Sequence, residues 1–466
     1  MTNDNNSLTA HTICAIATPP GMGGIAMVRV SGPEAIDIVA SRWRGKPLND
    51  MLSHTVHLGQ IIDSQGSLLD QVVLTLYRGP HSFTGEDVIE IACHGSRWIQ
   101  QQLLATLIDA GCRMATGGEF TRRAVVAGRL DLSQAEAVAD VIAAQSQASA
   151  RLALNQMRGG LSRELAALRE RLLHFVALME LELDFSEEDV EFADRTQVTA
   201  LASEIEQKIA GLAQSFHAGN AIRGGVPVAI VGQTNAGKST LLNALLHDDR
   251  ALVSDIHGTT RDVIEDTITM GGTLFRLIDT AGIRHSDDLV ETMGIERSFR
   301  AMDQAQIVLW VIDGTAALPH IEQFSHQILP HCHDKHLIAV VNKTDIADGQ
   351  PVTALLNRLQ PQTPVVAISA HSEADVARLE RHIVEAAALP QVDDDTVIIT
   401  NARHYQALRR AHEALQRTLV GLRDGLPGDL VSQDIRQCLH HLGTITGQIT
   451  TDEILGEIFA HFCVGK

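Results

Sequence analysis

Val228-Ala-Ile-Val-Gly-Gln-Thr-Asn-Ala-Gly-Lys-Ser-Thr240 is the stretch from which the rest of this chain is interpreted. Its apolar start is typical of a buried strand, its glycines predict a tight loop, and the Leu-rich residues 241–246 predict a helix. In this arrangement backbone N–H groups and the positive end of the helix surround a phosphate. Lys238 then reaches the terminal phosphates, and Ser239 offers a hydroxyl to Mg²⁺. The stretch predicts a nucleoside triphosphate site without saying which nucleotide.

Four more short motifs follow the phosphate loop in the order that a GTPase requires. Gly258-Thr-Thr-Arg-Asp262 offers a second hydroxyl for Mg²⁺, and Asp279-Thr-Ala-Gly282 follows an apolar run that ends near the metal and the γ-phosphate. Asn342-Lys-Thr-Asp345 and Ile368-Ser-Ala370 each follow another apolar run. The ordered set predicts a guanine-nucleotide-binding α/β fold.

Asp345 is the residue that points to guanine. Its carboxylate can accept hydrogen bonds from the ring N–H and the exocyclic amine of guanine, a pair of donors that adenine lacks. Because adenine would leave a desolvated carboxylate unpaired, such a site discriminates by roughly four to five powers of ten.

The hydrolytic machinery differs from that of small signalling GTPases at one position. Ile283 stands where a water-orienting glutamine is expected, and an aliphatic side chain cannot position a water. The nearest carboxylates are Glu291, Asp287 and Asp288, and the pattern does not choose among them.

Length and composition indicate an ordinary globular chain with several domains. It has 466 residues, 45% hydrophobic and 20% charged, and a formal net charge of −20, so bulk electrostatics do not favour nucleic acid. Its six cysteines show no Cys-x-x-Cys spacing, which fits a reducing cytoplasm and predicts neither zinc nor disulfides. The start of the chain has no pattern of a secretory signal, and the apolar runs are strand-length.

The periodicity divides the chain into segments of different character. Residues 12–118 mix short strands and helices, which predicts a compact α+β domain in which Arg29 and Glu90, by pattern alone, face solvent. Residues 131–219 are helical, with Ser133-Gln-Ala-Glu136 as a predicted capping box, and helix returns from Asn401. Two helical segments around an α/β unit predict that the nucleotide domain is inserted into one helical domain.

These motifs, with several others, resemble the MnmE (TrmE) family of tRNA-modification GTPases. The others are Ser82-Phe-Thr-Gly-Glu-Asp-Val88, Gly118-Glu-Phe-Thr-Arg-Arg-Ala124, Asp131-Leu-Ser-Gln-Ala-Glu-Ala137 and the terminal Cys463-Val-Gly-Lys466. The resemblance implies a multidomain α+β and α/β fold. Its expected parts are residues 1–125 as an N-terminal domain for dimerisation and folate binding, 126–222 and 391–466 as the two parts of a helical domain, and 223–390 as an inserted Ras-like GTPase domain.

The resemblance implies GTP hydrolysis that is stimulated by potassium and coupled to dimerisation of the GTPase domains. Glu291 matches the catalytic glutamate, Ser239 and Thr260 match the Mg²⁺ ligands, and Asn235, Ser254, Ile256 and Thr259 match the potassium site. A cation there would do the work of an arginine finger, which is worth roughly three to five powers of ten in rate. The expected GTP contacts are Asn235, Ala236, Gly237, Lys238, Ser239, Thr240, Ser254, Asp255, Ile256, His257, Gly258, Thr259, Thr260, Asp279, Thr280, Ala281, Gly282, Asn342, Lys343, Asp345, Ser369 and Ala370.

A folate site and a partner protein are implied as well. Arg29, Glu90, Arg129 and Lys466 match positions that contact 5-formyltetrahydrofolate or a related one-carbon folate, although Arg129 stands where the family often has lysine. Cys463 becomes a candidate participant in the chemistry. The implied product is a carboxymethylaminomethyl or aminomethyl group on carbon 5 of the wobble uridine of certain tRNAs. The implied assembly is a cytoplasmic homodimer that forms a heterotetramer with the FAD-dependent protein MnmG (GidA). That partner is expected to supply much of the tRNA binding, and no membrane is expected to take part.

Two other functions are compatible with the GTPase motifs alone. A ribosome-assembly GTPase would carry a basic RNA-binding domain, which neither the net charge nor the helical C-terminal segment supplies. A self-assembling structural GTPase would have no folate site.

Overall fold

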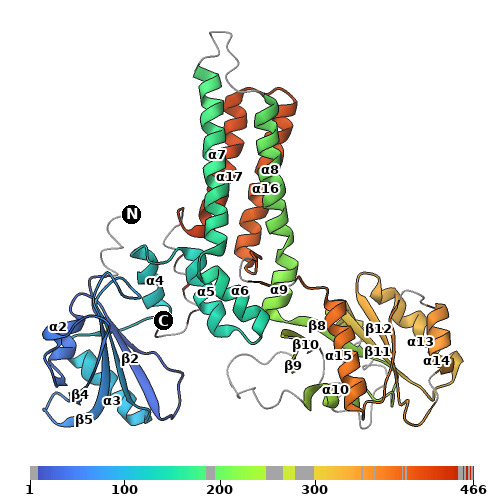
Figure 1. Cartoon of the computed structure of the whole chain (residues 1–466), viewed down its shortest axis with the longest axis horizontal. Coiled ribbons are helices and arrows are strands. Elements are labelled where there is room, and N and C mark those ends of the chain that lie inside the picture. Colours follow the sequence, from blue (N-terminus) through green and yellow to red (C-terminus); the bar gives the residue numbers. More distant parts are fainter. Residues whose placement is uncertain are drawn as a thin grey trace. The chain divides into compact units, whose positions relative to one another are not determined.

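The computed structural model describes two compact units. It covers residues 9–184, 195–247, 266–278, 299–347, 350–359, 363–390, 392–393 and 396–449, with Leu455, Ile458, Phe459, Phe462 and Gly465 beyond them. One unit consists of residues 1–142, 156–206 and 410–466, and the other of residues 143–155 and 207–409 (Figure 1). The domain boundaries expected at residues 125, 222 and 390 are finer than this division and stay predictions.

The first unit contains a seven-stranded sheet in the order β3-β4-β5-β6-β2-β1-β7, antiparallel except for the β1–β7 pair. Its strands are β1 (Ile13–Ile16), β2 (Ile25–Ser31), β3 (Trp43–Arg44), β4 (Thr55–Ile62), β5 (Leu68–Tyr77), β6 (Val88–His94) and β7 (Arg113–Met114). Helices α2 (Ala35–Ala40) and α3 (Arg97–Asp109) share a core with alternate residues of these strands, among them Val28, Leu74 and Ile91. The other residues of each strand point to the opposite face, because side chains alternate along a strand.

Helices far apart in the chain pack together in the same unit. α7 (Gly160–Asp184) lies beside α17 (Gly428–Thr446), and Arg169 Nη1 donates to the carbonyl oxygen of Leu439 at 3.5 Å (Figure 1). α8 (Arg195–Gln214) joins α16 (Ala402–Arg423) through a 2.6 Å contact between Glu206 and His412. The helical segments before and after the nucleotide segment therefore form one structure, which periodicity alone left as a hypothesis.

The helix at residue 132 begins with a different cap from the one predicted. α5 spans Leu132–Ala143, so Asp131 precedes its first residue. Gln134 N donates to Asp131 Oδ1 at 2.9 Å, and Asp131 N donates to Gln134 Oε1 at 3.0 Å. The prediction of Ser133 and Glu136 as the capping box was wrong, since the carboxylate two residues earlier reaches the free N–H groups first. Ser133 instead donates to Asp131 at 2.8 Å. The shorter helix α4 (Glu119–Val126) completes this unit, whereas most of α6 (Gln147–Met157) belongs to the second unit.

The second unit contains a six-stranded sheet in the order β13-β12-β11-β8-β10-β9, parallel except for β9. Its elements are α9 (Phe216–Gly224), β8 (Val226–Val231), α10 (Lys238–His247), β9 (Asp266–Met270), β10 (Thr273–Ile278), β11 (Ile307–Asp313), α13 (Leu318–Ile328), β12 (His336–Asn342), α14 (Gln350–Leu359), β13 (Val365–Ala367) and α15 (Glu373–Ala387).

Each face of this second sheet has its own buried core, so helices cover both faces. One core joins the strands to α10 and α15, and the other joins them to α13 and α14. This is the doubly covered parallel sheet expected from strands that are apolar along their whole length. The carboxyl ends of β8, β11 and β12 consequently meet at one edge, which is where such folds bind ligands. No helix among the residues described here is long and apolar enough to cross a membrane.

Candidate functional site

The loop between β8 and α10 has the geometry of a phosphate cradle. A Cβ on Gly232 (φ 156°) would meet the carbonyl oxygen of Val311, and a Cβ on Gly237 (φ 93°) would meet Nδ2 of Asn342. Asn235 has a left-handed φ of 64°, a conformation that asparagine adopts more readily than most non-glycine residues. The two glycines are therefore fixed by the close approach of neighbouring strands, and the loop keeps its N–H groups at the positive end of α10.

Lys238 lies inside this loop. Its ammonium donates to the carbonyl oxygens of Gly232 at 2.8 Å and Gln233 at 2.7 Å. Burial lowers the pKa of Lys238, because the surroundings disfavour its charged form. An anion beside this ammonium would favour its charged form. To bind a phosphate, the lysine would exchange its bonds to the two carbonyl oxygens for bonds to phosphate oxygens.

Asn342 joins the phosphate loop to the loop that follows β13. Its Nδ2 donates to the carbonyl oxygen of Ala236 at 3.0 Å, and its Oδ1 accepts from the N–H of Ala370 at 3.0 Å. The residue is 2% exposed, so both bonds are shielded from water. The neighbouring Ser369 is held by a 2.9 Å bond from its N–H to Asp375 of α15. Three loops from distant parts of the sequence are thereby fixed to one another.

Asp345 lies at the exposed end of the turn that follows Asn342 and β12. Lys343 has a left-handed φ of 68°, and its carbonyl accepts from the N–H groups of Ile346 and Ala347 at 3.2 Å. Asp345 is exposed, and the Ile346 side chain beside it is 70% exposed. An accessible carboxylate next to an uncovered apolar side chain suits the edge and the face of a heterocyclic base.

The structure brings together the predicted GTP residues that lie in its described part. Those on the phosphate loop are Asn235, Ala236, Gly237, Lys238, Ser239 and Thr240, and those on the two neighbouring loops are Asn342, Lys343, Asp345, Ser369 and Ala370. The remaining predicted positions, 254–260, 279–282 and Glu291, lie outside the described residues, as do Cys463 and Lys466.

A second candidate site lies on the sheet of the first unit. Arg29 of β2 is directly opposite Glu90 of β6, with Nη2 2.7 Å from Oε1, and the two side chains are 17% and 16% exposed. The rings of Phe83 and Phe120 each lie 5.7 Å from the guanidinium carbon. The pattern-based expectation that both charges face solvent was wrong, since each is covered and the two neutralise each other.

Other groups surround this ion pair. Tyr77 Oη is 3.5 Å from Glu90 Oε2, and burial followed by the Glu90 charge raises the pKa of Tyr77. Arg29 Nη1 also donates to the carbonyl oxygen of Gly465 at 3.3 Å, which places the end of the chain beside this pair. Arg129, the third predicted folate residue, is exposed, with its stem near Gly85.

Sequence reasoning missed a buried charge network next to this site. Arg123 is fully buried and donates to Glu86 at 3.0 Å and to Glu119 at 3.1 Å. Ser31 donates to Glu86 at 2.7 Å, and Arg113 donates to Glu119 at 3.1 Å. The sequence did contain a signal for this network. Glu86 belongs to the Ser82–Val88 motif, and Glu119 and Arg123 belong to the Gly118–Ala124 motif. The two motifs are halves of one network.

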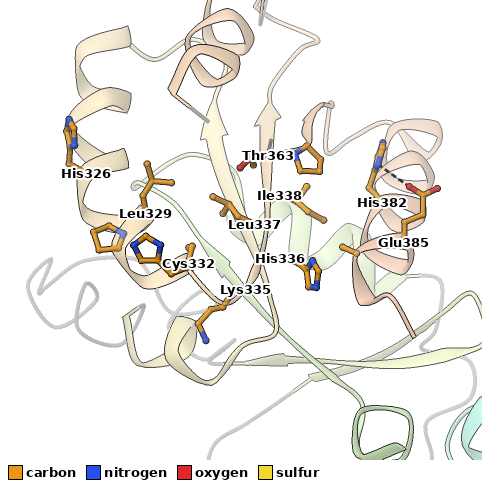
Figure 2. Close-up of a pocket in the computed structure, with 14 residues that line it drawn as sticks. His326, Leu329, Cys332, Lys335, His336, Leu337, Ile338, Thr363, His382 and Glu385 are labelled. Atoms are coloured by element: carbon orange, nitrogen blue, oxygen red, sulfur yellow. Dashed lines mark ion pairs between the residues drawn. The ribbon is translucent and has the colours of Figure 1, made fainter. Parts of the chain in front are cut away.

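One sizeable cavity of the second unit lies away from the nucleotide residues. It has a volume of about 820 Å³ and is at the edge where β12 begins, whereas the nucleotide residues follow the end of β12 (Figure 2). His382 and Glu385, 3.6 Å apart on α15, face His326, Leu329 and Cys332 across it. In the described ranges, no group of three or more His, Cys, Asp or Glu side chains could hold a metal ion. The cavity contains none of the predicted site residues.

Comparisons with known proteins cover almost the whole chain. The family model described as the MnmE helical domain matches residues 132–463, and the model described as GTP-binding protein TrmE N-terminus matches residues 12–129. The chain is 53% identical over 462 residues to the tRNA modification GTPase MnmE of Parabacteroides distasonis, covering 98% of this chain and 100% of that protein. It is 48% identical over 466 residues to the protein of the same name from Flavobacterium johnsoniae, with 98% and 100% covered. Among solved structures, Aquifex aeolicus Era bound to GDP and AlF4⁻ matches 40% of this chain and 65% of that chain, at 26% identity and a TM-score of 0.28.

Proposed function

Because this chain belongs to the MnmE family of tRNA modification GTPases, we propose that the loops at the carboxyl edge of the second sheet bind and hydrolyse GTP in the service of that modification. The observation that carries the proposal is the buried Asn342, which links the phosphate loop to the loop of Ala370. A phosphate site and a base site are then held at a fixed separation, as one nucleotide requires.

GTP would be held at both ends. The phosphates would lie on the loop of residues 235–240 with Lys238, and Asp345 would accept from the guanine edge, with Ser369 and Ala370 beside it. Ser239 and Thr260 would bind Mg²⁺, and Asp279 and Gly282 would face the γ-phosphate. The exposed Asp345 carboxylate and the coupled loops support this assignment.

Hydrolysis would depend on potassium and on Glu291. Asn235, Ser254, Ile256 and Thr259 would hold the potassium ion, and Glu291 would orient the attacking water, since Ile283 cannot. The exposed side chain and left-handed backbone of Asn235 support a role that reaches outward from the loop. Measuring GTP turnover in potassium and in sodium tests this assignment: faster turnover in potassium supports it, and equal rates would remove the cation site.

A one-carbon folate would bind beside Arg29 and Glu90, with Arg129 and Lys466 as further contacts. A half-buried ion pair flanked by two phenyl rings offers what a pteridine with a charged tail needs: aromatic faces, a guanidinium and a carboxylate. The 3.3 Å bond from Arg29 to Gly465 supports including the end of the chain in this site. Cys463, two residues earlier, would take part in the chemistry.

The active assembly would be a homodimer that joins the FAD-dependent protein MnmG and adds a carboxymethylaminomethyl or aminomethyl group to carbon 5 of the wobble uridine. Val56, Leu58 and Val73 support self-association, because they lie on one face of β4 and β5 and are 63%, 67% and 39% exposed. The net charge of −20 supports leaving much of the tRNA binding to the partner. The expected place of action is the cytoplasm.

Nucleoside analysis of tRNA tests the function as a whole. Cells that lack this protein should lose the modified wobble uridine, and the full chain should restore it. The family models match the residues before the GTPase segment and those after it. The alternative of a ribosome-assembly GTPase is therefore not supported by any segment outside these matches.

A further inference from the structure

Asp313 is a charged residue at the nucleotide edge to which neither the motifs nor the family resemblance gave a role. It is the last residue of β11 and lies opposite Asn342, the last residue of β12. Its Oδ2 is 2.7 Å from Nζ of Lys343, and the two side chains are 21% and 29% exposed. The ion pair thus joins the end of one strand to the guanine-reading turn of the next.

The Asp313 carboxylate is itself held in place. Its other oxygen, Oδ1, accepts from the N–H of Thr315 at 2.8 Å and from the Thr315 hydroxyl at 2.7 Å. Gly314 N donates to the carbonyl oxygen of Asn342 at 2.9 Å, which ties the two strand ends together. Burial would raise the pKa of Asp313, but the bonds from Lys343 and Thr315 outweigh burial and hold it below its ordinary value. The carboxylate is therefore ionised and held by hydrogen bonds at both of its oxygens.

Lys343 is the residue that this carboxylate restrains. Its backbone is fixed in the left-handed region, between the buried Asn342 and the exposed Asp345. A lysine stem has four carbons and loses considerable rotamer freedom when it is held, so an unanchored Lys343 would sample many conformations. With its ammonium on Asp313, its apolar stem is confined to the space between the guanine-reading turn and the end of β11.

We propose that Asp313 is a positioning residue for the guanine nucleotide: by holding the Lys343 ammonium, it lays the stem of that lysine across one face of the base whose edge Asp345 reads. The inference rests on the GTP site proposed above and adds a residue to it. Asp313 acts only through Lys343, so it contributes to nucleotide affinity and not to the transfer of the γ-phosphoryl group.

A simpler role for the pair would be to fasten β11 to β12. Partly exposed ion pairs contribute little to stability, and the two strands already share a full parallel ladder. A fastening role predicts a small loss of stability with unchanged nucleotide binding. The positioning role predicts weaker nucleotide binding with an unchanged thermal midpoint.

The experiment measures GDP affinity, GTP turnover and the thermal midpoint of the full chain for Asp313→Ala and for the isosteric Asp313→Asn, which keeps an acceptor for Thr315. We expect Asp313→Ala to raise the Kd for GDP about tenfold and Asp313→Asn to raise it less, with kcat at saturating GTP within about twofold of wild type. Asp303→Ala is the matched control, because Asp303 also pairs with a basic side chain, His331, in the same unit at 3.3 Å. It should bind GDP as wild type does.

A double variant separates the two roles. If Asp313 acts through Lys343, Asp313→Ala combined with Lys343→Ala should bind GDP no more weakly than Lys343→Ala alone. Multiplying losses would contradict the inference, and so would unchanged GDP binding in both Asp313 variants. Failure of the wild-type chain to bind GDP would instead contradict the proposed function on which the inference rests.

Discussion

Asn342, at the end of β12, donates a hydrogen bond of 3.0 Å to the carbonyl oxygen of Ala236 in the phosphate loop, 106 residues earlier in the chain. The same side chain accepts from Ala370 N. Asn342→Ala would remove both bonds and leave a buried carbonyl and a buried N–H without this partner. We expect GDP binding to weaken by about tenfold to a hundredfold. Asn357→Ala, on the exposed side of α14, is the control and should bind normally.

Asp345→Asn should change the preferred base. An amide offers a donor where the carboxylate offered only acceptors, so it suits the oxygen that xanthine carries in place of the exocyclic amine of guanine. We expect affinity for GDP to fall and affinity for xanthosine diphosphate to rise, as measured by equilibrium binding. Asp334→Asn changes an exposed aspartate elsewhere in the unit and should leave the preference alone. Unchanged base preference in Asp345→Asn would remove Asp345 from the base site.

Glu119 should make the stability of the first unit depend on pH in the acidic range. Burial would raise its pKa, but hydrogen bonds from Arg113, from the N–H of Thr116 and from Arg123 outweigh burial and lower it from 4.5 to about 2. Because the folded pKa is below the unfolded one, the stabilisation is present above about pH 4.5 and is lost as pH falls towards about 2. We expect Glu119→Gln to lower the free energy of unfolding near neutral pH by about 3 kcal/mol.

The deficit of Glu119→Gln should shrink steadily as the pH is lowered from 5 to 3, as followed by the thermal midpoint. Glu204→Gln is the control, because Glu204 pairs with Arg171 at 59% exposure and should show no such trend. A deficit that is constant over this range would mean that the Glu119 charge is not the stabilising feature.

Glu90→Gln should weaken folate binding while leaving GDP binding unchanged. The carboxylate fixes the Arg29 guanidinium through bonds of 2.9 Å and 2.7 Å, and a neutral amide would hold it less firmly. We expect the Kd for 5-formyltetrahydrofolate to rise about tenfold, measured on the full chain. Glu34→Gln, an exposed residue of the same unit, should bind folate as wild type does. Equal affinity in both variants would exclude the Arg29–Glu90 pair as the folate contact.

The nucleotide edge was predictable because its determinants are local. Each motif directly follows a strand-like run, and the carboxyl ends of parallel strands meet at one edge, so Lys238, Asn342 and Asp345 could be placed together without knowing the fold in detail. The Asn342 bond to Ala236 extends that argument, since it sets the distance between two motifs that the sequence only orders.

Long-range pairing was not predictable in the same way. Arg29 and Glu90 are 61 residues apart, and only the register of β2 against β6 makes them face each other. Arg123 of α4 likewise reaches a distant residue, because it pairs with Glu86, 37 positions earlier in the chain. Even locally, competition decided the start of α5, where Asp131 and Ser133 both offer a capping oxygen and the carboxylate takes the position.

Mass spectrometry of tRNA nucleosides from cells that lack this protein, complemented at matched levels with wild type, Lys238→Ala or Cys463→Ser, tests most directly whether its GTP site serves wobble-uridine modification. We predict that wild type restores the carboxymethylaminomethyl or aminomethyl group and that neither variant does. Restoration by Lys238→Ala, or a modification that persists in cells lacking the protein, would contradict this account.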